Sequence, residues 1–481
     1  MWAVVLPAQR WEWWPLAICD TAAAADTIQY QAYVSAVASS GKYSPFMLRA
    51  NQHGNASLAP FSSNFSAGVF KQATSPARWW DYDFGVQLTG RTNTDPRRQV
   101  RTIVYPMTTI TGYFEQLYAH VRLSVVDITA GIHPIQCGSQ SNSLSMGGLL
   151  FSGNAHPIPR ISIGIDEYIA FPGLFGYFEF KGGLSYGWLD DDNFYTDNVK
   201  LHHKFLGLRV GGHLPITLAY EIHHAAQWGG YRYNGNEKVD YGNSFSDFWN
   251  VFLFRSGGTS MSDQLNAQGN HIGFQELTLT YQHRHWRATA YWQAIFEDMS
   301  AAFIGFGMNA ADGLWGLNIQ QSQWPYINQL TYEFLNTTSQ SGPLHDKDGL
   351  VFAGRDSYYT NLAYPQGWTY YGNIIGNPYI QTNNSRVRAH FLGLGGDIHG
   401  YKYRIMASYV DNYGVYQSAL PGYGFDQYSH NTSLLLEVSR LFDKAWGLEF
   451  TFALAGDIGP QYGNSFGGYL RIAKKGILTN Y

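Results

Sequence analysis

Histidine pairs and an aspartate run are the residues whose types could support metal or acid–base chemistry. The pairs His202-His203 and His223-His224 lack the spacing of a helical zinc motif, in which a glutamate lies between two histidines four residues apart. On a strand, neighbouring side chains point to opposite faces, so only one histidine of each pair can face a common interior. The aspartates at 190–192 lack the glycine and the distal glutamate of a calcium loop. We therefore predict no metal site, no cofactor and no catalytic residue, and interpret the histidines as lumenal or interfacial.

A second set of residues combines aromatic rings with carboxylates and guanidinium groups in long loops. Aromatic rings stack on the apolar faces of sugars while Asp, Asn and Arg bind hydroxyl groups, so this set predicts a carbohydrate surface. Two structural alternatives are a self-packed loop plug and an outer aromatic girdle, and pairs of acidic residues leave glycoside hydrolysis open. The candidate binding residues are Trp228, Asp247, Trp249, Arg255, Asp312, Trp315, Arg355, Asp356, Trp368 and Tyr371.

The elements that must position these residues are β-strands, because apolar and polar residues alternate along many segments. From 178 to 188 the even positions are mostly aromatic or aliphatic, whereas Glu179, Lys181 and Ser185 occupy odd ones. A tilted strand needs about 9 to 11 such residues to cross a bilayer. Aromatic residues near the ends of the apolar rows, such as Tyr186 with Trp188, favour membrane interfaces over a soluble sandwich core. The same alternation recurs at 82–88, 214–222 and 448–454.

The composition of the chain narrows its class. Aromatic residues make up 16% of the 481 residues and charged residues 14%. Mean hydropathy is only −0.24, as in a barrel that hides its apolar residues in alternation. A net charge of −4 gives no basic surface for nucleic acid. Two cysteines, Cys19 and Cys137, cannot build a disulfide framework.

Connections of unequal length indicate a barrel with two different rims. Short turns on one rim and long loops on the other are typical of bacterial outer-membrane barrels. At about 25 residues per strand and connection, the chain predicts about 18 strands. The predicted fold class is therefore all-β: a single transmembrane antiparallel β-barrel of about 18 strands, with a short N-terminal periplasmic or plug segment. Short links are expected at 442–446, 398–401 and 283–285, and long ones at about 226–271, 297–325 and 337–385.

The N-terminal residues predict a leader followed by an irregular segment. Residues 1–25 end in Ala23-x-Ala25, a signal-peptidase pattern, although Arg10 and Pro15 interrupt the apolar core. Residues 26–60 are expected to form a first strand or a periplasmic or plug element. Residues 61–481 are expected to form the barrel and its long extracellular loops.

The order of several loop motifs matches a known family. They include Ser152-Gly153-Asn154-Ala155, Asp247-Phe248-Trp249, Asp312-Gly313-Leu314-Trp315-Gly316, Glu333-Phe334-Leu335-Asn336 and Gly367-Trp368-Thr369-Tyr370-Tyr371-Gly372. With these motifs the chain resembles the capsule-assembly Wzi family of outer-membrane barrels, in its Bacteroidetes type, over about residues 30–400. The resemblance implies an 18-stranded barrel in the outer membrane of a Gram-negative cell. It also implies a lectin that holds exported polysaccharide on the surface, without enzymatic activity.

We therefore predict a non-enzymatic outer-membrane barrel that binds capsule or a similar glycan and attaches it to the cell surface. Its expected partners are surface polysaccharide, outer-membrane lipid and other envelope export proteins. The alternative is a porin-like transport channel, because a polar inward face and this strand count leave room for a pore. A mouth sealed by the long loops would favour binding over transport.

Overall fold

The computed structural model describes residues 27–73, 79–93, 97–100, 103–106, 110–135, 137–140, 143–191, 196–258, 267–297, 311–340, 345–347, 350–353, 357–415, 428–444 and 446–480. The predicted leader at 1–25 lies outside the described residues, as do the candidates Arg355 and Asp356. Among the described residues, no helix is long and apolar enough to span a membrane.

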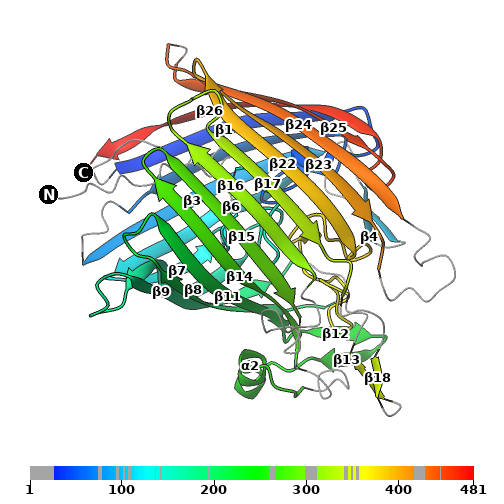
Figure 1. Ribbon diagram of the computed structural model, residues 1–481. Helices are drawn as coiled ribbons and strands as arrows, with labels where there is room; N and C mark the ends of the chain where they lie inside the picture. The colour runs from blue at the N-terminus through cyan, green and yellow to red at the C-terminus, as the bar shows by residue number, and fades with distance from the viewer. Residues whose placement is uncertain are drawn as a thin grey trace.

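An 18-stranded antiparallel sheet closes on itself to form the barrel (Figure 1). Strands adjacent in the chain pair with one another, and the last strand pairs with the first through Thr27 to Ser39. The predicted fold class is confirmed. The barrel strands are β1 Thr27–Ser39, β2 Phe61–Lys71, β3 Trp80–Asn93, β6 Ile110–Leu123, β7 Val126–Ile132, β8 Pro159–Ala170, β9 Phe178–Leu189, β10 Val199–Val210, β11 Ile216–Trp228, β14 Asn270–His283, β15 Trp286–Phe296, β16 Gly313–Gln321, β17 Gln329–Asn336, β22 Val387–Ile398, β23 Tyr401–Asn412, β24 Ser429–Phe442, β25 Leu448–Ile458 and β26 Ser465–Asn480.

Smaller elements lie in the connections between barrel strands. Two helices and four two-stranded hairpins occur in the described residues. They are α1 Phe46–Arg49, α2 Phe245–Phe252, β4 Arg97–Val100 with β5 Ile103–Pro106, β12 Tyr231–Asn234 with β13 Glu237–Asp240, β18 His345–Lys347 with β19 Leu350–Ala353, and β20 Thr369–Tyr370 with β21 Asn373–Ile374.

The two rims of the barrel differ as the link lengths predicted. Tight turns at 124–125, 284–285 and 399–400 lie on the rim that also holds both ends of the described chain (Figure 1). His399 and Gly400 both take positive φ, 54° and 84°, which is the turn geometry that matches the twist of a β-hairpin. Short turns are periplasmic in outer-membrane barrels, so the opposite rim with the long loops is extracellular.

The expected long link at 297–325 is wrong in its second half. Residues 313–321 form strand β16, whose outward side chains are Trp315, Leu317 and Ile319. The inward-facing set includes Leu314 and Gly316, so an apolar residue and a glycine stand where a polar residue would mark the alternation.

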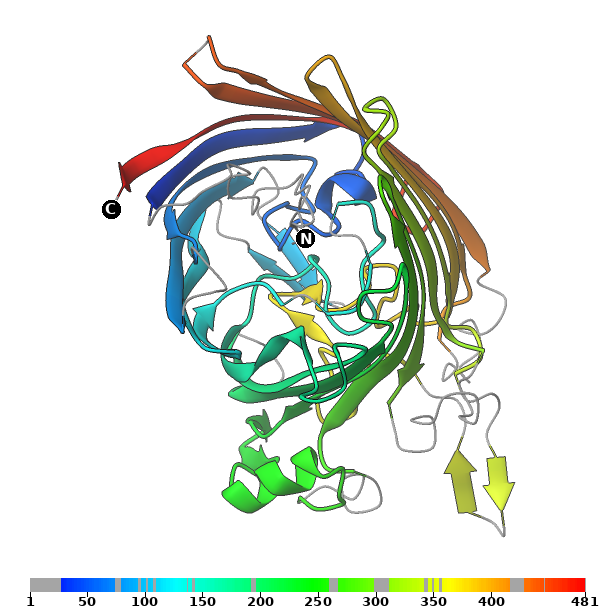
Figure 2. The same ribbon diagram turned by 60° about the vertical axis from the view of Figure 1, so that its left-hand side comes forward.

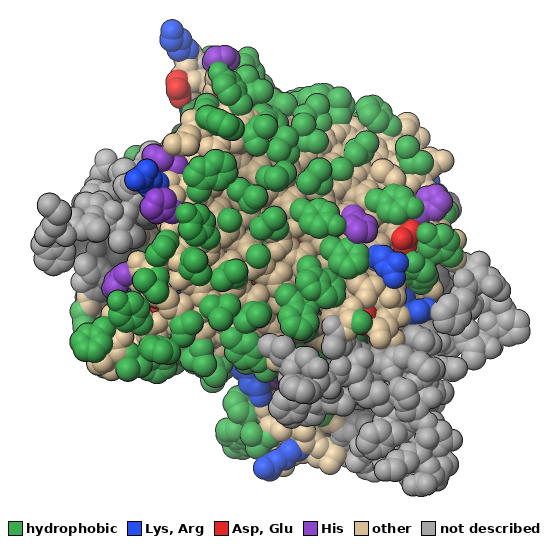
Figure 3. All heavy atoms as spheres, in the orientation of Figure 1, with side chains coloured by type: hydrophobic (Ala, Val, Ile, Leu, Met, Phe, Trp, Pro, Cys, Tyr) green, Lys and Arg blue, Asp and Glu red, His purple; other side chains and the backbone are tan. Residues whose placement is uncertain are grey.

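The outward face of the wall is apolar, and the inward face is polar or packed against protein. On β9, Phe178, Leu184 and Trp188 are exposed, whereas Ser185 on the opposite face is buried. Figure 3 shows hydrophobic side chains covering one side of the wall, with most charged side chains near its margins. This exposed apolar surface is what a hydrocarbon environment requires.

Substituting arginine for a leucine of the outward face tests this orientation. Leu436 is 44% exposed in the outward row of β24, whereas Leu441 belongs to the inward row near the periplasmic turn. We expect Leu436→Arg to lower the free energy of unfolding in lipid vesicles by about 2–4 kcal/mol, because it places a charge in hydrocarbon. Leu441→Arg, measured by the same denaturant titration, should lower it by less than about 1 kcal/mol. Equal losses would contradict the orientation.

Three segments from the extracellular rim fill the lumen. The described parts of 40–60, 133–158 and 357–386, here called the plug, lie inside the strands in Figure 2. Residues 27–60 therefore contribute both the first barrel strand and part of the plug. Strand β7 has only 7 residues, so the chain leaves the wall early and enters the lumen after Ile132. Plug side chains such as Phe46 and Leu150 form one buried core with inward wall residues such as Phe274 and Leu335.

Candidate functional site

Carboxylates on the inward wall hold the plug by its backbone. Glu333 of β17 accepts hydrogen bonds from the Met146 N–H at 2.6 Å and from the Ser145 hydroxyl at 2.7 Å. The hydroxyl of Tyr291, from β15, donates to the same carboxylate at 2.5 Å. Asp457 of β25 accepts from the Phe46 N–H at 2.6 Å, at the start of α1. Because both carboxylates are buried and accept backbone N–H groups of the plug, we interpret these contacts as positioning the plug.

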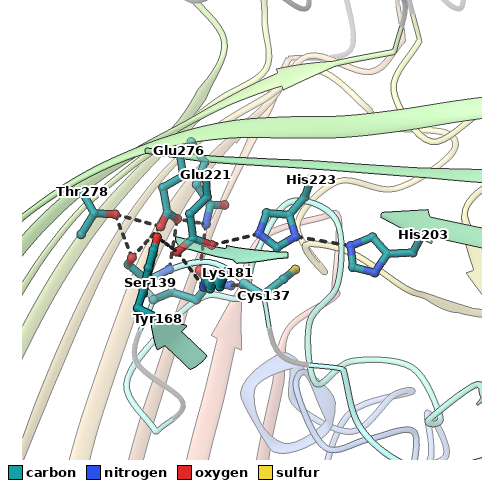
Figure 4. A network of polar contacts seen from close by, with 11 residues as sticks. Cys137, Ser139, Tyr168, Lys181, His203, Glu221, His223, Glu276 and Thr278 are labelled. Carbon is teal, nitrogen blue, oxygen red and sulfur yellow. Dashed lines mark hydrogen bonds and ion pairs between the residues drawn. The ribbon is translucent and has the colours of Figure 1, made fainter. Parts of the chain in front are cut away.

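A polar network lines the lumen beside the plug segment 137–140 (Figure 4). Glu221 accepts from Lys181 at 2.7 Å and from Tyr168 at 2.9 Å, and its other oxygen lies 3.0 Å from Nε2 of His223. His203 continues the chain at 3.3 Å from His223. These histidines are lumenal, as predicted, and their polar contacts are with one another and with Glu221.

Glu276 of β14 fastens the same plug segment. Its two oxygens accept from the Ser139 N–H at 3.0 Å and the Ser139 hydroxyl at 2.5 Å. Beside it, Cys137 is a buried free cysteine, and burial raises the pKa of its thiol to about 12. A thiol that stays protonated is a poor nucleophile, so Cys137 acts as a small core residue.

A small cavity lies between the plug and the wall. A cavity between the wall residues Tyr33 and Tyr469 and the plug residue Leu48 has a volume of about 20 Å³, room for about one water molecule. Burial lowers the pKa of His156 to about 3 and that of His53 to about 4, so these two histidines of the plug are neutral at pH 7. At the level of the plug, these two imidazoles therefore add no charge to the packed side chains of the described lumen.

The extracellular mouth is a cap of loops joined by hydrogen bonds. Tyr364 donates to the Gly229 carbonyl at 3.1 Å, and Thr196 donates to the Ala363 carbonyl at 3.0 Å. The Tyr371 N–H donates to Asp191 at 2.9 Å, which links hairpin β20–β21 to the loop after β9. These contacts make one continuous surface from the plug and from the loops around β9 to β11.

Exposed tyrosines and charged groups share this cap. Tyr371 is 45% exposed and Tyr233, on hairpin β12–β13, is 64% exposed. Lys238, opposite Tyr233 in the hairpin, places its ammonium 4.1 Å from the ring centroid of Tyr231. Asp190 is exposed beside the loop that holds Tyr371. Ring faces with neighbouring charged groups suit a ligand that has both apolar faces and hydroxyl groups.

Three of the described sequence-derived candidates are buried, and two of them, Trp368 and Asp312, lie among the loops of the plug and cap. Trp368 is 0% exposed in the plug and donates from Nε1 to the Leu150 carbonyl at 2.8 Å. Asp312 is also 0% exposed and accepts from the Gln340 N–H at 2.7 Å and from the Tyr358 hydroxyl at 2.7 Å. Burial raises the pKa of Asp312, although the hydrogen bonds it accepts act in the opposite direction. These contacts indicate that Trp368 and Asp312 hold the loops together and do not face a ligand.

Other candidates lie on the outside of the wall. Trp315 points outward from β16, with its ring 6.3 Å from that of Trp292 and 5.6 Å from that of Phe334. This is the aromatic girdle that the sequence left as an alternative. Trp228 is buried at the end of β11 beneath Phe248 of α2.

The α2 candidates are separated from the mouth surface. Asp247 closes the capping box of α2 by accepting from the Ser244 N–H at 2.8 Å. Trp249 is 42% exposed on the same helix, and Arg255 follows it in an exposed position. The structure thus brings together Asp247, Trp249 and Arg255, while only Tyr371 of the described candidates lies on the cap surface.

The sequence did not single out the wall carboxylates that hold the plug. Glu276, Glu333 and Asp457 each lie on the inward face of a strand, next to apolar outward residues. An acidic side chain at an inward position is a detectable signal, but it marks a watery lumen as well as a plug contact. Hairpin β12–β13 was likewise hidden within one long loop.

The fold and the cap define a class: an outer-membrane β-barrel whose lumen is closed by its own extracellular loops. No curated protein sequence matches the chain. A family model does match it over residues 38–388, and the chain belongs to the capsule assembly protein Wzi family. The resemblance noted in the loop motifs is thereby confirmed.

The solved structure of Escherichia coli Wzi shows the same fold at low sequence identity. Wzi of Escherichia coli, described as an outer-membrane protein involved in group 1 capsule assembly and as a carbohydrate-binding β-barrel, has a TM-score of 0.58 at 14% identity, covering 94% of this chain and 84% of its own. OccK5 (OpdH) of Pseudomonas aeruginosa has a TM-score of 0.48 at 11% identity, covering 95% and 99%. OccAB2 of Acinetobacter baumannii has a TM-score of 0.47 at 9% identity, covering 94% and 98%.

Proposed function

We propose that this protein binds an exported surface polysaccharide, a capsule or similar glycan, and attaches it to the outer membrane without enzymatic activity. The observation that carries the proposal is the cap: the long loops are folded together and held from below by buried wall carboxylates. A rigid outer surface is suited to binding, because little conformational freedom is lost when a ligand arrives. The description of E. coli Wzi as a carbohydrate-binding β-barrel supports the same function.

We place the glycan contacts on the cap surface, at Tyr371 and Tyr233 with Asp190 and Lys238 as polar partners. Both tyrosines offer exposed ring area for stacking on sugars. The other described candidates are buried or lie outside the wall, so Tyr371 is the candidate from the sequence that we retain here. The polysaccharide would arrive from envelope export proteins on the periplasmic or outer-leaflet side.

Absence of catalysis is part of the proposal. Acid–base hydrolysis of a glycoside needs a pair of accessible carboxylates. The buried carboxylates Asp312 and Glu333 already accept hydrogen bonds from backbone N–H groups and side chains. A transport channel is the second candidate function, and the packed lumen favours binding over it.

Removing the two exposed rings should weaken glycan binding. We expect the double variant Tyr233→Ala and Tyr371→Ala to bind polysaccharide extracted from the same cells about tenfold more weakly, since each aromatic contact contributes about 0.5–1.5 kcal/mol. Binding is measured on the purified detergent-solubilised barrel. The control is Trp446→Ala, which removes a ring that is 83% exposed at a periplasmic turn. Unchanged affinity in the double variant, or an equal loss in the control, would refute the proposed contact surface.

A further inference from the structure

Helix α2 lies outside the barrel wall rather than over the mouth. Figures 1 and 2 show it beyond the extracellular ends of the strands that precede and follow it in the chain, β11 and β14. Val251 of α2 is 0% exposed and belongs to a buried cluster with Ala226 and Trp228 of β11. The capping box at Ser244 starts the helix, and Gln268, just before β14, donates to Asp247 at 3.0 Å. Val251 therefore packs the helix against the wall, and the bond from Gln268 ties the start of the helix to the end of its loop.

The part of the wall that α2 covers is polar, whereas the same outward rows are apolar closer to the periplasmic rim. His202, His224 and His271 belong to the same outward rows as the exposed residues Leu208, Leu218 and Leu279. All three histidines are buried, because aromatic side chains of the α2 loop cover them. Centroid distances are 5.7 Å from Phe248 to His202, 4.5 Å from Phe254 to His224 and 4.2 Å from Phe254 to His271.

Lys204 extends this covered polar patch toward the membrane. Its ammonium lies 4.2 Å from the ring centroid of Phe252 and donates to the Phe252 carbonyl. Leu206, the next outward residue on β10, is 51% exposed. An ammonium and three imidazoles facing acyl chains would be costly, and α2 shields them from that environment. The helix thus takes the place of the wall as the outermost surface at this level.

The two long edges of α2 differ in polarity. Phe245 is 74% and Trp249 42% exposed on one edge, and Leu253, just past the helix, is 46% exposed. Ser246, Asn250 and Asp247 form the other edge. Phe252 reaches the deeper wall residue Lys204, whereas Asp247 contacts the loop at Ser244, so the aromatic edge lies on the membrane side. An edge of aromatic residues above a polar edge is the pattern of a helix that lies in a membrane interface.

We propose that α2 is an interfacial helix that docks on lipid of the outer leaflet, with Phe245, Trp249 and Leu253 at the boundary between headgroups and acyl chains. Lipid is the expected contact because the exposed aromatic edge of α2 is continuous with the lipid-facing surface formed by Leu206 and the outward residues closer to the periplasmic rim. The three exposed apolar side chains then contact lipid, and Trp249 belongs to the membrane contact rather than to the glycan surface. The proposal is independent of which polysaccharide the cap binds.

Spin labels on single cysteines test the position of α2. In a background with Cys19→Ser and Cys137→Ala, labels are placed by Phe245→Cys, Ser246→Cys, Leu208→Cys and Leu362→Cys, and the protein is reconstituted in phosphatidylcholine vesicles. Leu208 is an exposed wall residue and Leu362 is 84% exposed in the cap, so they define the lipid and water limits. We expect the ratio of oxygen to nickel-chelate accessibility at 245 to exceed that at 246 by at least about threefold and to approach that at 208.

Two results would overturn the proposal. Equal chelate accessibility at 245, 246 and 362 would place α2 in water, free to contact glycan. Loss of accessibility to both reagents at 245 would indicate a contact with a second protein copy. Quenching by brominated lipid gives a check without cysteine changes. If Trp249 contacts lipid, Trp249→Phe should lower the quenched share of the emission, while the outward residues Trp188 and Trp315 stay quenched in both proteins. Unchanged quenching in that variant would also refute the proposal.

Discussion

Trp368→Ala should loosen the plug and turn a closed barrel into one that conducts ions intermittently. Trp368 is 0% exposed, contacts Phe151 and donates to the Leu150 carbonyl. Replacing a buried tryptophan by alanine costs about 3–5 kcal/mol, through lost burial and the cavity left behind. The wall strands keep their own hydrogen bonds, so the loss falls on the plug. Planar-bilayer recording should show no steady conductance for the unaltered protein and brief openings for the variant.

Trp249→Ala is the matched control, since that tryptophan is 42% exposed on α2 and outside the plug. It should leave the recording silent. A steady conductance in the unaltered protein would instead favour the transport channel. A silent Trp368→Ala barrel with unaltered protease resistance would show that the plug does not depend on this side chain.

Glu333→Ala should free the plug segment around Met146 from the wall. The change leaves the Met146 N–H and the hydroxyls of Ser145 and Tyr291 without their acceptor. Each unsatisfied buried donor costs about 1–3 kcal/mol, so a local loss of about 3 kcal/mol or more is expected. Since about 1.4 kcal/mol is a factor of ten, amide hydrogen exchange at 143–150 should accelerate by about 100-fold or more.

A conservative variant and a control variant accompany Glu333→Ala. Glu333→Gln keeps one acceptor oxygen and should show an intermediate acceleration. Glu449→Ala removes a more exposed glutamate whose ion pair with Arg471 is 3.9 Å long, and should leave exchange at 143–150 unchanged. Slow exchange at 143–150 in Glu333→Ala would mean that other contacts hold the segment.

Alternation predicted the wall because each strand is half exposed to lipid. The segment 178–188 became β9 with its aromatic residues outward, and the short links at 398–401 and 283–285 became tight turns. Alternation of apolar and polar residues does not reveal a strand whose inward face is also apolar, as with Leu314 beside Trp315 in β16. Inward residues of that kind pack against the plug, whose position depends on contacts far apart in the chain.

The candidate site was harder to predict than the wall. A loop tryptophan in a sequence carries no sign of whether its ring faces water, lipid or other loops. Trp368 faces the plug core, Trp315 faces outward from the wall and Trp249 lies on α2. Tyr371 remains exposed because its backbone, at φ 48°, turns at the outer end of hairpin β20–β21. Only the folded arrangement of loops separates these environments.

Three wall carboxylates hold the plug through main-chain N–H groups. Every amino acid except proline supplies an N–H, so the fastening at Met146, Phe46 and Ser139 does not depend on which side chains the loops carry. Outward-facing loop residues could therefore be exchanged for others without detaching the loops. The same barrel could therefore carry loop surfaces for different glycans, while the inward carboxylates that bind the plug backbone stay the same.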